Sequence, residues 1–429
     1  MLEVIGSSLI GLLLEFFTRQ PPNLETVPVL AWQDAAIFNL PTEPDPRAET
    51  IVDRYLQDLS RRGFASSRQG VWIQSDLAQL AQHRGNVPIS AASITKIATS
   101  LAALEKWGSQ HRFETQVLAA GRLNQGTLEG DLVIIGGSDP FFVWEEAFAL
   151  GNTLNQLGIR RVTGNLVISG DFAMNYNSNA LTAGRLLRQA LDRSSWSSQA
   201  LRQYRTLPQG TPRPEIKIAG SVVLKQAPQS SQLLVRHQSM SLAEILRQMN
   251  IYSNNKMSEM LARNVGGAAV VAQRAAQAAK VPRDEIKLVN GSGLGINNRI
   301  SPRAACAMLL AIERHLLDQP LGVADLFPVS GRDSLGTMLN RRIPNYTTVK
   351  TGTLAEVSAL AGVIPTRDRG LVWFAIINGG GDIEGLRAQQ DILLQRLVQE
   401  WGTLPIDLAT NGEWLGDPQR SIAVTDNRG

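Results

Sequence analysis

The stretch AASITKIATSLAALEKW, residues 91–107, predicts the helix around which the rest of the fold is arranged. Apolar residues recur along it at helical spacing, and few polar side chains interrupt them. A helix that is apolar on most of its surface is typical of the centre of a domain, because it has no face for water. The residues that define the spacing are Ile94, Ile97, Ala98, Leu101 and Leu104.

Two polar residues at the start of this helix, Ser93 and Lys96, form an S-x-x-K motif. Their spacing places both side chains on one face, within reach of each other. A serine hydroxyl is a poor nucleophile until a base takes its proton, and a lysine can do so when burial or a second cation lowers its pKa. Alone, the motif more often marks two solvated side chains. In this apolar setting we expect both residues inside the protein, with Ser93 as nucleophile and Lys96 as base.

A second motif, Ser253-Asn254-Asn255, matches S-x-N. Taken alone, it indicates a helix N-cap or a turn. Taken with the first motif, it predicts that Ser253 relays a proton to the leaving group. The amide of Asn255 would then hold Lys96 and a substrate carbonyl.

A third motif, Lys-Thr-Gly-Thr, follows at residues 350–353, at the end of a strand predicted over residues 347–351. Gly352 would let a substrate backbone lie close to this strand, because it has no side chain. Lys350 and Thr351 can bind a carboxylate. We also expect Lys350 to be the second cation that lowers the pKa of Lys96.

The three motifs fit one reaction when they are taken together and in this order. The backbone N–H groups of Ser93 and Thr353 would form an oxyanion hole for the attacked carbonyl. This set of motifs occurs in serine acyl-enzymes, which need no histidine. A nucleophile elbow of the G-x-S-x-G type is absent from the sequence. The glycine-rich run at residues 290–295 lacks the spacing of a phosphate-binding loop and predicts a tight turn.

Composition excludes several other classes of protein. The chain has 429 residues and a net charge of 42 − 38 = +4, and its basic residues form no cluster of the kind that binds nucleic acid. A single cysteine, Cys306, excludes an internal disulfide and a site with several thiolates. The four histidines are far apart in the sequence. We therefore predict no metal and no organic cofactor.

The N-terminal stretch over residues 4–14 is apolar but shorter than a membrane span. Its length suits the core of a signal peptide, yet Glu3 precedes it and no basic residue does. Two interpretations stay open: a short amphipathic helix that packs on the protein, or an export signal or membrane-surface anchor.

The remaining pattern predicts an α/β fold of the α+β type. Strands over residues 359–365 and 371–378 would form an antiparallel hairpin, which a helix over residues 386–401 would cover. Within the middle of the chain, the run EGDLVI from Glu129 recurs as TGNLVI from Thr163, 34 residues later, which predicts a strand–helix–strand unit. The predicted domains are an N-terminal segment and proline-rich linker (1–46), a main domain (47–120 and 233–402), an inserted smaller α/β domain (121–232) and a polar tail (403–429).

On these residues the sequence resembles the penicillin-binding protein 4 type of D-alanyl-D-alanine carboxypeptidase/endopeptidase, over roughly residues 50–400. Further matching stretches are Gly136-Gly-Ser-Asp-Pro140, Gly291-Ser-Gly-Leu294 and Pro328-Val-Ser-Gly331. The gap of 253 − 93 = 160 residues between the first two motifs is typical of that type, which carries a domain there. The gap is shorter than in the larger members, and Asn290 stands where the family commonly has Asp.

The resemblance implies a β-lactamase/transpeptidase-like antiparallel sheet flanked by helices, so that the main domain would be the penicillin-binding domain. It implies a serine-type D-Ala-D-Ala carboxypeptidase, with possible endopeptidase activity, that acts on peptidoglycan stem peptides in the periplasm or cell envelope and is acylated by penicillins. The catalytic residues would be Ser93, Lys96, Ser253 and Asn255, and the substrate-binding residues Lys350, Thr351, Gly352 and Thr353. Two alternatives stay open: a β-lactamase or esterase of the same fold, and a non-catalytic cell-wall-binding protein.

Overall fold

A computed structural model describes residues 44–76, 78–333, 335–406 and 412–424 of the chain. The apolar stretch at residues 4–14 and most of the proline-rich linker lie outside these described residues, and so do the expectations attached to them. Within the described ranges, no helix combines the length and the apolar character that a membrane crossing requires.

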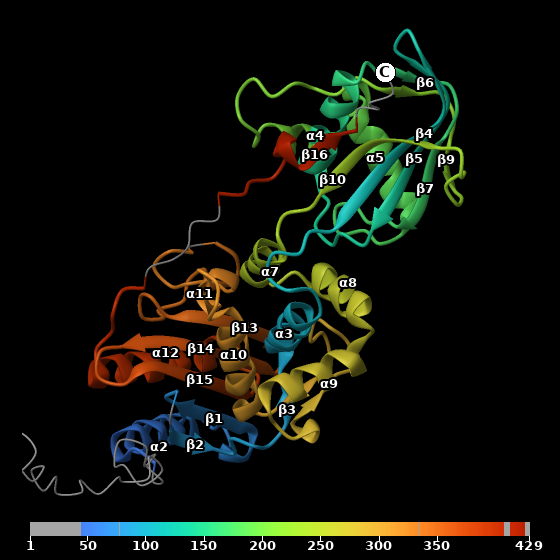
Figure 1. The fold of residues 1–429 in the computed structure, drawn as a ribbon. Coiled ribbons are helices and arrows are strands. Elements are labelled where there is room, and N and C mark those ends of the chain that lie inside the picture. Colours follow the sequence, from blue (N-terminus) through green and yellow to red (C-terminus); the bar gives the residue numbers. More distant parts are fainter. Residues whose placement is uncertain (1–43, 77, 334, 407–411, 425–429) are drawn as a thin grey trace, which may run out of the picture. The chain divides into compact units, whose positions relative to one another are not determined.

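A five-stranded antiparallel sheet forms the base of the main domain (Figure 1). Its central hairpin pairs Thr366 with Gly370 next to the turn, as the sequence predicted. The strand that carries the Lys-Thr-Gly-Thr motif lies at the edge of the sheet: Val329 bridges to Thr348 at its start, and from Lys350 on no strand among the described residues pairs with its outer side. In spatial order the strands are β13 (Thr348–Leu354), β14 (Val357–Thr366), β15 (Gly370–Gly379), β1 (Gln69–Gln74) and β2 (Gln79–His83).

Both faces of this sheet are covered by helices, which explains why its inner strands are apolar without alternation. In β15, Phe374 faces one apolar core and Trp373 faces the other. One face packs against α2 (Pro46–Arg61) and α12 (Ile383–Trp401). The other face packs against α10 (Pro302–Leu316) and the helices around it.

The predicted central helix is α3 (Thr95–Trp107), and all of its residues from Thr95 to Leu104 are buried. A separate 3-10 turn, η3 (Ala92–Ile94), precedes it and carries Ser93. The helices packed around α3 are α7 (Leu242–Ile251), α8 (Asn255–Val265), α9 (Ala268–Ala279) and α10. The short helix α11 (Val323–Leu326) packs against α7. A small sheet in the same domain consists of β3 (Ile89–Ser90), β11 (Ile286–Lys287) and β12 (Arg299–Ile300).

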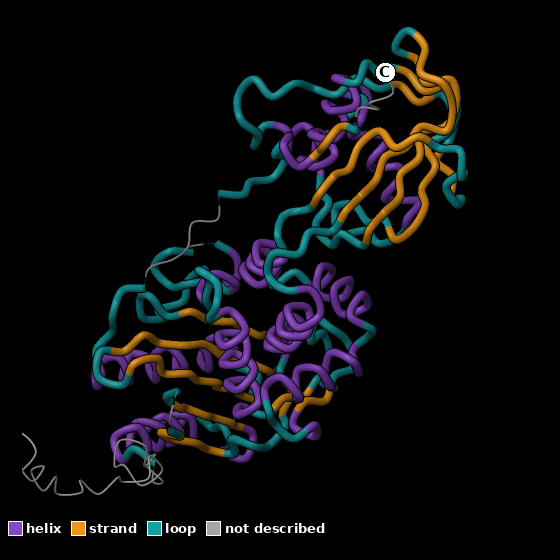
Figure 2. The backbone as a smooth tube through the Cα atoms, in the orientation of Figure 1, coloured by secondary structure: helices purple, strands orange, loops and turns teal. Residues whose placement is uncertain are grey.

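A second, mixed sheet forms in the middle of the chain (Figure 2). It has its own apolar core. The repeated sequence runs lie side by side in it: Leu132 pairs with Leu166 in parallel register, which is the 34-residue offset of the sequence repeat. The strand–helix–strand prediction is confirmed. The strands are β4 (Glu114–Asn124), β5 (Thr127–Gly137), β6 (Arg161–Val162), β7 (Leu166–Asp171), β8 (Lys217–Ile218), β9 (Val222–Leu224), β10 (Gln232–Gln238) and β16 (Ser421–Ala423). The helices are α4 (Trp144–Gln156), α5 (Ala180–Leu191) and α6 (Ser198–Tyr204).

The bounds of this second sheet differ from the predicted insert over residues 121–232, because β4 begins before residue 121 and β10 ends after residue 232. The expected polar tail over residues 403–429 also contributes, since β16 pairs with β10. We propose that the inserted domain comprises residues 114–238 together with the tail strand.

Candidate active site

Ser93 stands on a strained turn rather than in the first turn of a regular helix. The residue before it, Ala92, has a φ of 46°, in the left-handed region that non-glycine residues rarely adopt. Such conformations cost free energy and persist where the surrounding structure enforces them, often at functional sites. The turn leaves the Ser93 side chain partly exposed, whereas its neighbours are buried.

The Lys96 side chain is fully buried directly beside Ser93. Its ammonium nitrogen lies 3.0 Å from Ser93 Oγ, 2.7 Å from Asn255 Oδ1 and 2.8 Å from the main-chain oxygen of Ser292. Burial lowers the pKa of Lys96 to about 7, against the opposing charge of Glu259. A substantial fraction of Lys96 is therefore neutral near neutral pH, as a base for Ser93 requires.

Lys350 is the second buried lysine of the site. Its Nζ donates to Ser253 Oγ at 3.1 Å and to the main-chain oxygen of Thr351 at 2.9 Å. Burial, and then repulsion from Lys96, hold the pKa of Lys350 well below its usual range. We expected Lys350 to lower the pKa of Lys96 as a second cation; burial is the main cause of the low pKa of both lysines, and the repulsion between their ammonium groups adds to it.

The residues of the S-x-N motif have two different roles: one caps a helix, and the other two contact the lysines of the site. The side chain of Asn254 caps α8 by accepting from the N–H groups of Lys256 and Met257. The N-cap interpretation therefore applies to Asn254 alone. Ser253, with a φ of 51°, and Asn255 are left to contact the two lysines.

The edge strand β13 brings the third motif against the nucleophile. A Cβ atom at Gly352 would lie 3.0 Å from both the Ala91 oxygen and the Ser93 nitrogen, so this position has little room for a side chain. Thr351 Oγ1 forms a hydrogen bond of 2.7 Å with Thr337 Oγ1. The contacts thus bring seven of the eight predicted site residues together, whereas the side chain of Thr353 is exposed and contacts none of the other seven by a hydrogen bond.

The loop at residues 290–295 completes the surroundings of Lys96, a contact that the sequence did not predict. Residues 290–295 do form a tight turn, with Gly293 at a φ of 83°, but the turn also lines the site through the oxygen of Ser292. Both carboxylate oxygens of Glu259 hold this loop: they accept from the N–H groups of Gly291 at 3.1 Å and of Ser292 at 2.9 Å. The one signal in the sequence was the position of Glu259, one turn after Asn255 on the same helix.

A buried S-x-x-K pair, an S-x-N loop and a Lys-Thr-Gly-Thr edge strand in mutual contact define a serine acyl-enzyme of the penicillin-interacting class. The chain belongs to the D-Ala-D-Ala carboxypeptidase 3 (S13) family, which it matches over residues 49–181 and 184–399. The family, the fold and the serine-carboxypeptidase class predicted from the sequence are confirmed.

Individual relatives are distant but cover most of the chain. It is 23% identical to the D-alanyl-D-alanine carboxypeptidase DacB of Haemophilus influenzae, over 81% of this chain and 91% of the relative. It is 25% identical to carboxypeptidase DacB of Mycolicibacterium smegmatis, over 83% of this chain and 89% of the relative.

Two solved structures have the same fold. One is a penicillin G-acylated predatory endopeptidase of Bdellovibrio bacteriovorus, with a TM-score of 0.70 and 21% identity over 83% of this chain and 99% of that one. The other is penicillin-binding protein 4 of Haemophilus influenzae, with a TM-score of 0.60 and 21% identity over 81% of this chain and 99% of that one.

Proposed function

We propose that this protein hydrolyses the D-Ala–D-Ala bond of peptidoglycan stem peptides through an acyl-enzyme on Ser93. The observation that supports this most directly is the buried Lys96, which lies 3.0 Å from Ser93 Oγ and has a pKa of about 7. A nucleophile and its base within hydrogen-bond reach are the minimum that acyl transfer requires.

In the first half of the reaction, neutral Lys96 takes the Ser93 proton as Oγ attacks the carbonyl carbon. The N–H groups of Ser93 and Thr353 stabilise the oxyanion. The C–N bond then breaks, and the leaving amine receives a proton from Lys96 through Ser253. In the second half, water attacks the ester carbonyl and Lys96 takes a proton from the water. Lys96 then passes this proton to Ser93 Oγ as the bond from Oγ to the acyl carbon breaks and the shortened peptide leaves.

The contact between Ser253 and Lys350 supports the relay, because Lys350 Nζ donates to the Ser253 hydroxyl and holds it in place. The same Lys350, together with Thr351 and Thr353 on the open edge of β13, is suited to the terminal carboxylate of the substrate. Asn255 would bind the substrate carbonyl on the other side of the cleft.

A cavity of about 250 Å³ supports a role for the inserted domain in binding the rest of the stem peptide. It is lined by Tyr252 and Asn254 beside the S-x-N motif and by Phe141 and Tyr176 from the insert. A site of this size accommodates further residues of a peptide chain, which also suits cross-linked substrates and endopeptidase activity. Because peptidoglycan lies in the cell envelope, we place the activity there.

Intact-mass measurement after incubation with penicillin tests this function. We expect a mass increase of one penicillin molecule on the wild-type protein and none on a folded Ser93→Ala variant, which lacks the nucleophile. A stable adduct also distinguishes a DD-peptidase from a β-lactamase, which would return to the unmodified mass. Labelling that persists in Ser93→Ala would disprove the assignment of the nucleophile, and Ser292 would be the next residue to replace.

A further inference from the structure

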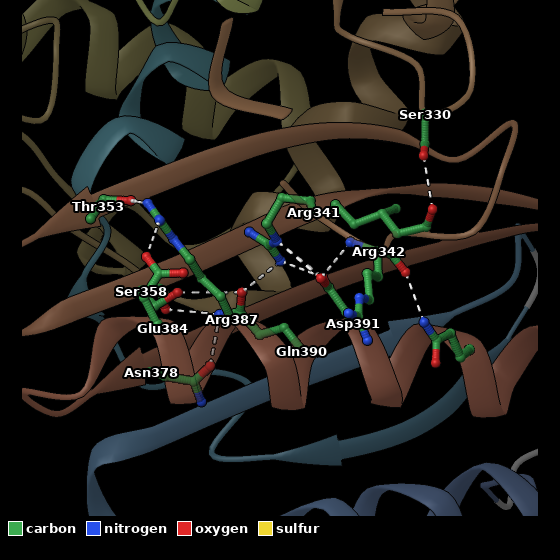
Figure 3. A network of polar contacts seen from close by, with 12 residues as sticks. Ser330, Arg341, Arg342, Thr353, Ser358, Asn378, Glu384, Arg387, Gln390 and Asp391 are labelled. Carbon is green, nitrogen blue, oxygen red and sulfur yellow. Dashed lines mark hydrogen bonds and ion pairs between the residues drawn. The ribbon is translucent and has the colours of Figure 1, made fainter. Parts of the chain in front are cut away.

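The last threonine of the third motif has a charged partner that the mechanism above does not use. Arg387, on α12, donates from Nη2 to Thr353 Oγ1 at 2.8 Å, and Figure 3 shows its side chain reaching from the helix to the strand. Its Nη1 donates to Glu384 Oε1 at 2.6 Å. The side chain of Glu384 is 81% exposed and that of Arg387 31%, so the guanidinium lies against the motif at the surface of the protein.

This contact fixes what the Thr353 hydroxyl can do. A hydroxyl has one proton to donate, and a guanidinium can only donate. When Thr353 Oγ1 accepts from Arg387, its own proton is left for another acceptor, and the neighbouring positive charge strengthens that donation. A carboxylate is such an acceptor.

Arg387 also supplies a charge that the two lysines do not guarantee. Lys96 has to be neutral to act as a base, and burial opposes the charged form of Lys350. An arginine side chain stays protonated in proteins, so Arg387 keeps its positive charge whichever lysine carries a proton. No catalytic role near Ser93 follows from this; the contact is with the carboxylate end of the motif.

We propose that Arg387 is a positioning residue for recognition of the terminal carboxylate, because it orients the Thr353 hydroxyl as a donor and brings a permanent positive charge to that end of β13. This inference rests on the proposed function, since it assigns a specificity role within the same site. Glu384 then acts against substrate binding, because its negative charge offsets that of Arg387.

The test compares an N-acyl-D-Ala-D-Ala peptide that has a free carboxylate with the same peptide amidated at its C-terminus. Arg387→Met should raise KM for the free acid about tenfold, the scale of one charge-assisted hydrogen bond. It should change KM for the amide by less than about twofold. Glu384→Gln should lower KM for the acid, and the effects of Arg387→Met and Thr353→Val should not add, because both remove the same donor.

Arg61→Met is the matched control, because Arg61 forms an ion pair of the same i,i+3 type with Asp58 on α2. We expect no difference between the two peptides for this variant. Equal losses on acid and amide for Arg387→Met, or additive effects with Thr353→Val, would overturn the proposal and leave Arg387 a structural role. The failure of the proposed function is distinguishable, since it would appear as penicillin labelling that does not depend on Ser93.

Discussion

Lys96 and Lys350 are both fully buried, and each has lost the water that normally stabilises an ammonium group. Their partners separate their roles. Lys96 contacts the nucleophile Ser93, whereas Lys350 contacts Ser253, the residue proposed to return the proton. Because two ammonium groups are buried in one site, it is costly for both lysines to be charged. A neutral lysine can then take a proton from the hydroxyl that it contacts at a modest cost in free energy.

Replacing Lys96 by arginine tests its role as the base. Lys96→Arg keeps a positive charge but cannot give up a proton, so we expect acylation by penicillin to slow by about 10²–10⁴-fold, the usual contribution of a general base. In the wild-type protein the rate should rise with pH through about 7, because the neutral form of Lys96 is the active one. A Lys96→Arg variant with a near-normal rate and an unchanged melting temperature would remove Lys96 from the mechanism.

Glu259 offers a second test, because its charge acts on the pKa of Lys96 in the direction opposite to burial. Its charge raises the pKa of Lys96, so Glu259→Gln should lower that pKa further and move the rising limb of the pH–rate profile to lower pH. The amide oxygen can still accept one of the two N–H groups of the loop. The measurement is the acylation rate as a function of pH. A shift to higher pH would mean that Glu259 does not act on Lys96 through its charge.

At the scale of elements, η3 and the loop at residues 290–295 hold each other in place. A Cβ atom at Gly293 would lie 1.8 Å from the oxygen of Ala92, the residue with the strained backbone before Ser93. Only a glycine permits both this approach and the positive φ of Gly293. The position of the nucleophile therefore depends on a loop that is remote in the sequence.

Substituting two glycines of this loop separates backbone strain from contact. Gly293→Ala should destabilise the protein by more than about 2 kcal/mol and slow acylation, because it adds both a left-handed alanine and a clash with the Ser93 turn. Gly295→Ala is the control: its φ is also positive, at 94°, but the added Cβ meets nothing within 4 Å. Denaturant unfolding and penicillin acylation measure the two effects. Equal acylation rates in both variants would contradict the coupling of loop and turn.

The elements that could be predicted from the sequence are those with local signals. The helix at residues 91–107, the hairpin and the three motifs each carry a periodicity or a spacing that physics links to a structure. The 3-10 turn at Ser93 could not be predicted, because the left-handed Ala92 packs against Gly293, which lies far along the chain. For the same reason the loop could be assigned its shape but not its contact with Lys96. The partner of Thr353, Arg387, likewise comes from a different element and forms no motif with it.

At the scale of the molecule, the chain forms two large sheets with separate apolar cores. The tail strand β16 belongs to the second of these sheets. Beside β16, Arg420 donates to the buried carboxylate of Glu146 at 2.5 Å, and the N–H of Gly416 donates to it at 3.0 Å. Burial alone would raise the pKa of Glu146, but its contact with His237 Nε2 at 3.3 Å and the charge of Arg420 outweigh burial and lower it. This cluster links the segment before β16 to helix α4 of the inserted domain.

Removing the Arg420 side chain should therefore destabilise the inserted domain without changing the acylation reaction at Ser93. Arg420→Met leaves the carboxylate of Glu146 buried with less compensation, and we expect a loss of about 3–5 kcal/mol in the free energy of unfolding of that domain. The double variant Glu146→Gln/Arg420→Met should recover part of the loss, because residue 146 then no longer carries a buried carboxylate without its arginine partner. Thermal unfolding measures the stability, and penicillin acylation at low temperature should stay near the wild-type rate. An undiminished melting temperature in Arg420→Met would contradict the role of this cluster.

The pairing of β16 with β10 limits how this enzyme can be shortened or recombined. Excision of residues 114–238 as a cassette would leave residues 421–423 as an orphaned strand, with backbone groups open to pairing between molecules and hence to aggregation. A minimal peptidase must end soon after Trp401, where α12 is complete. Transfer of the insert to another scaffold must carry the distant C-terminal segment with it, as a second and discontinuous graft.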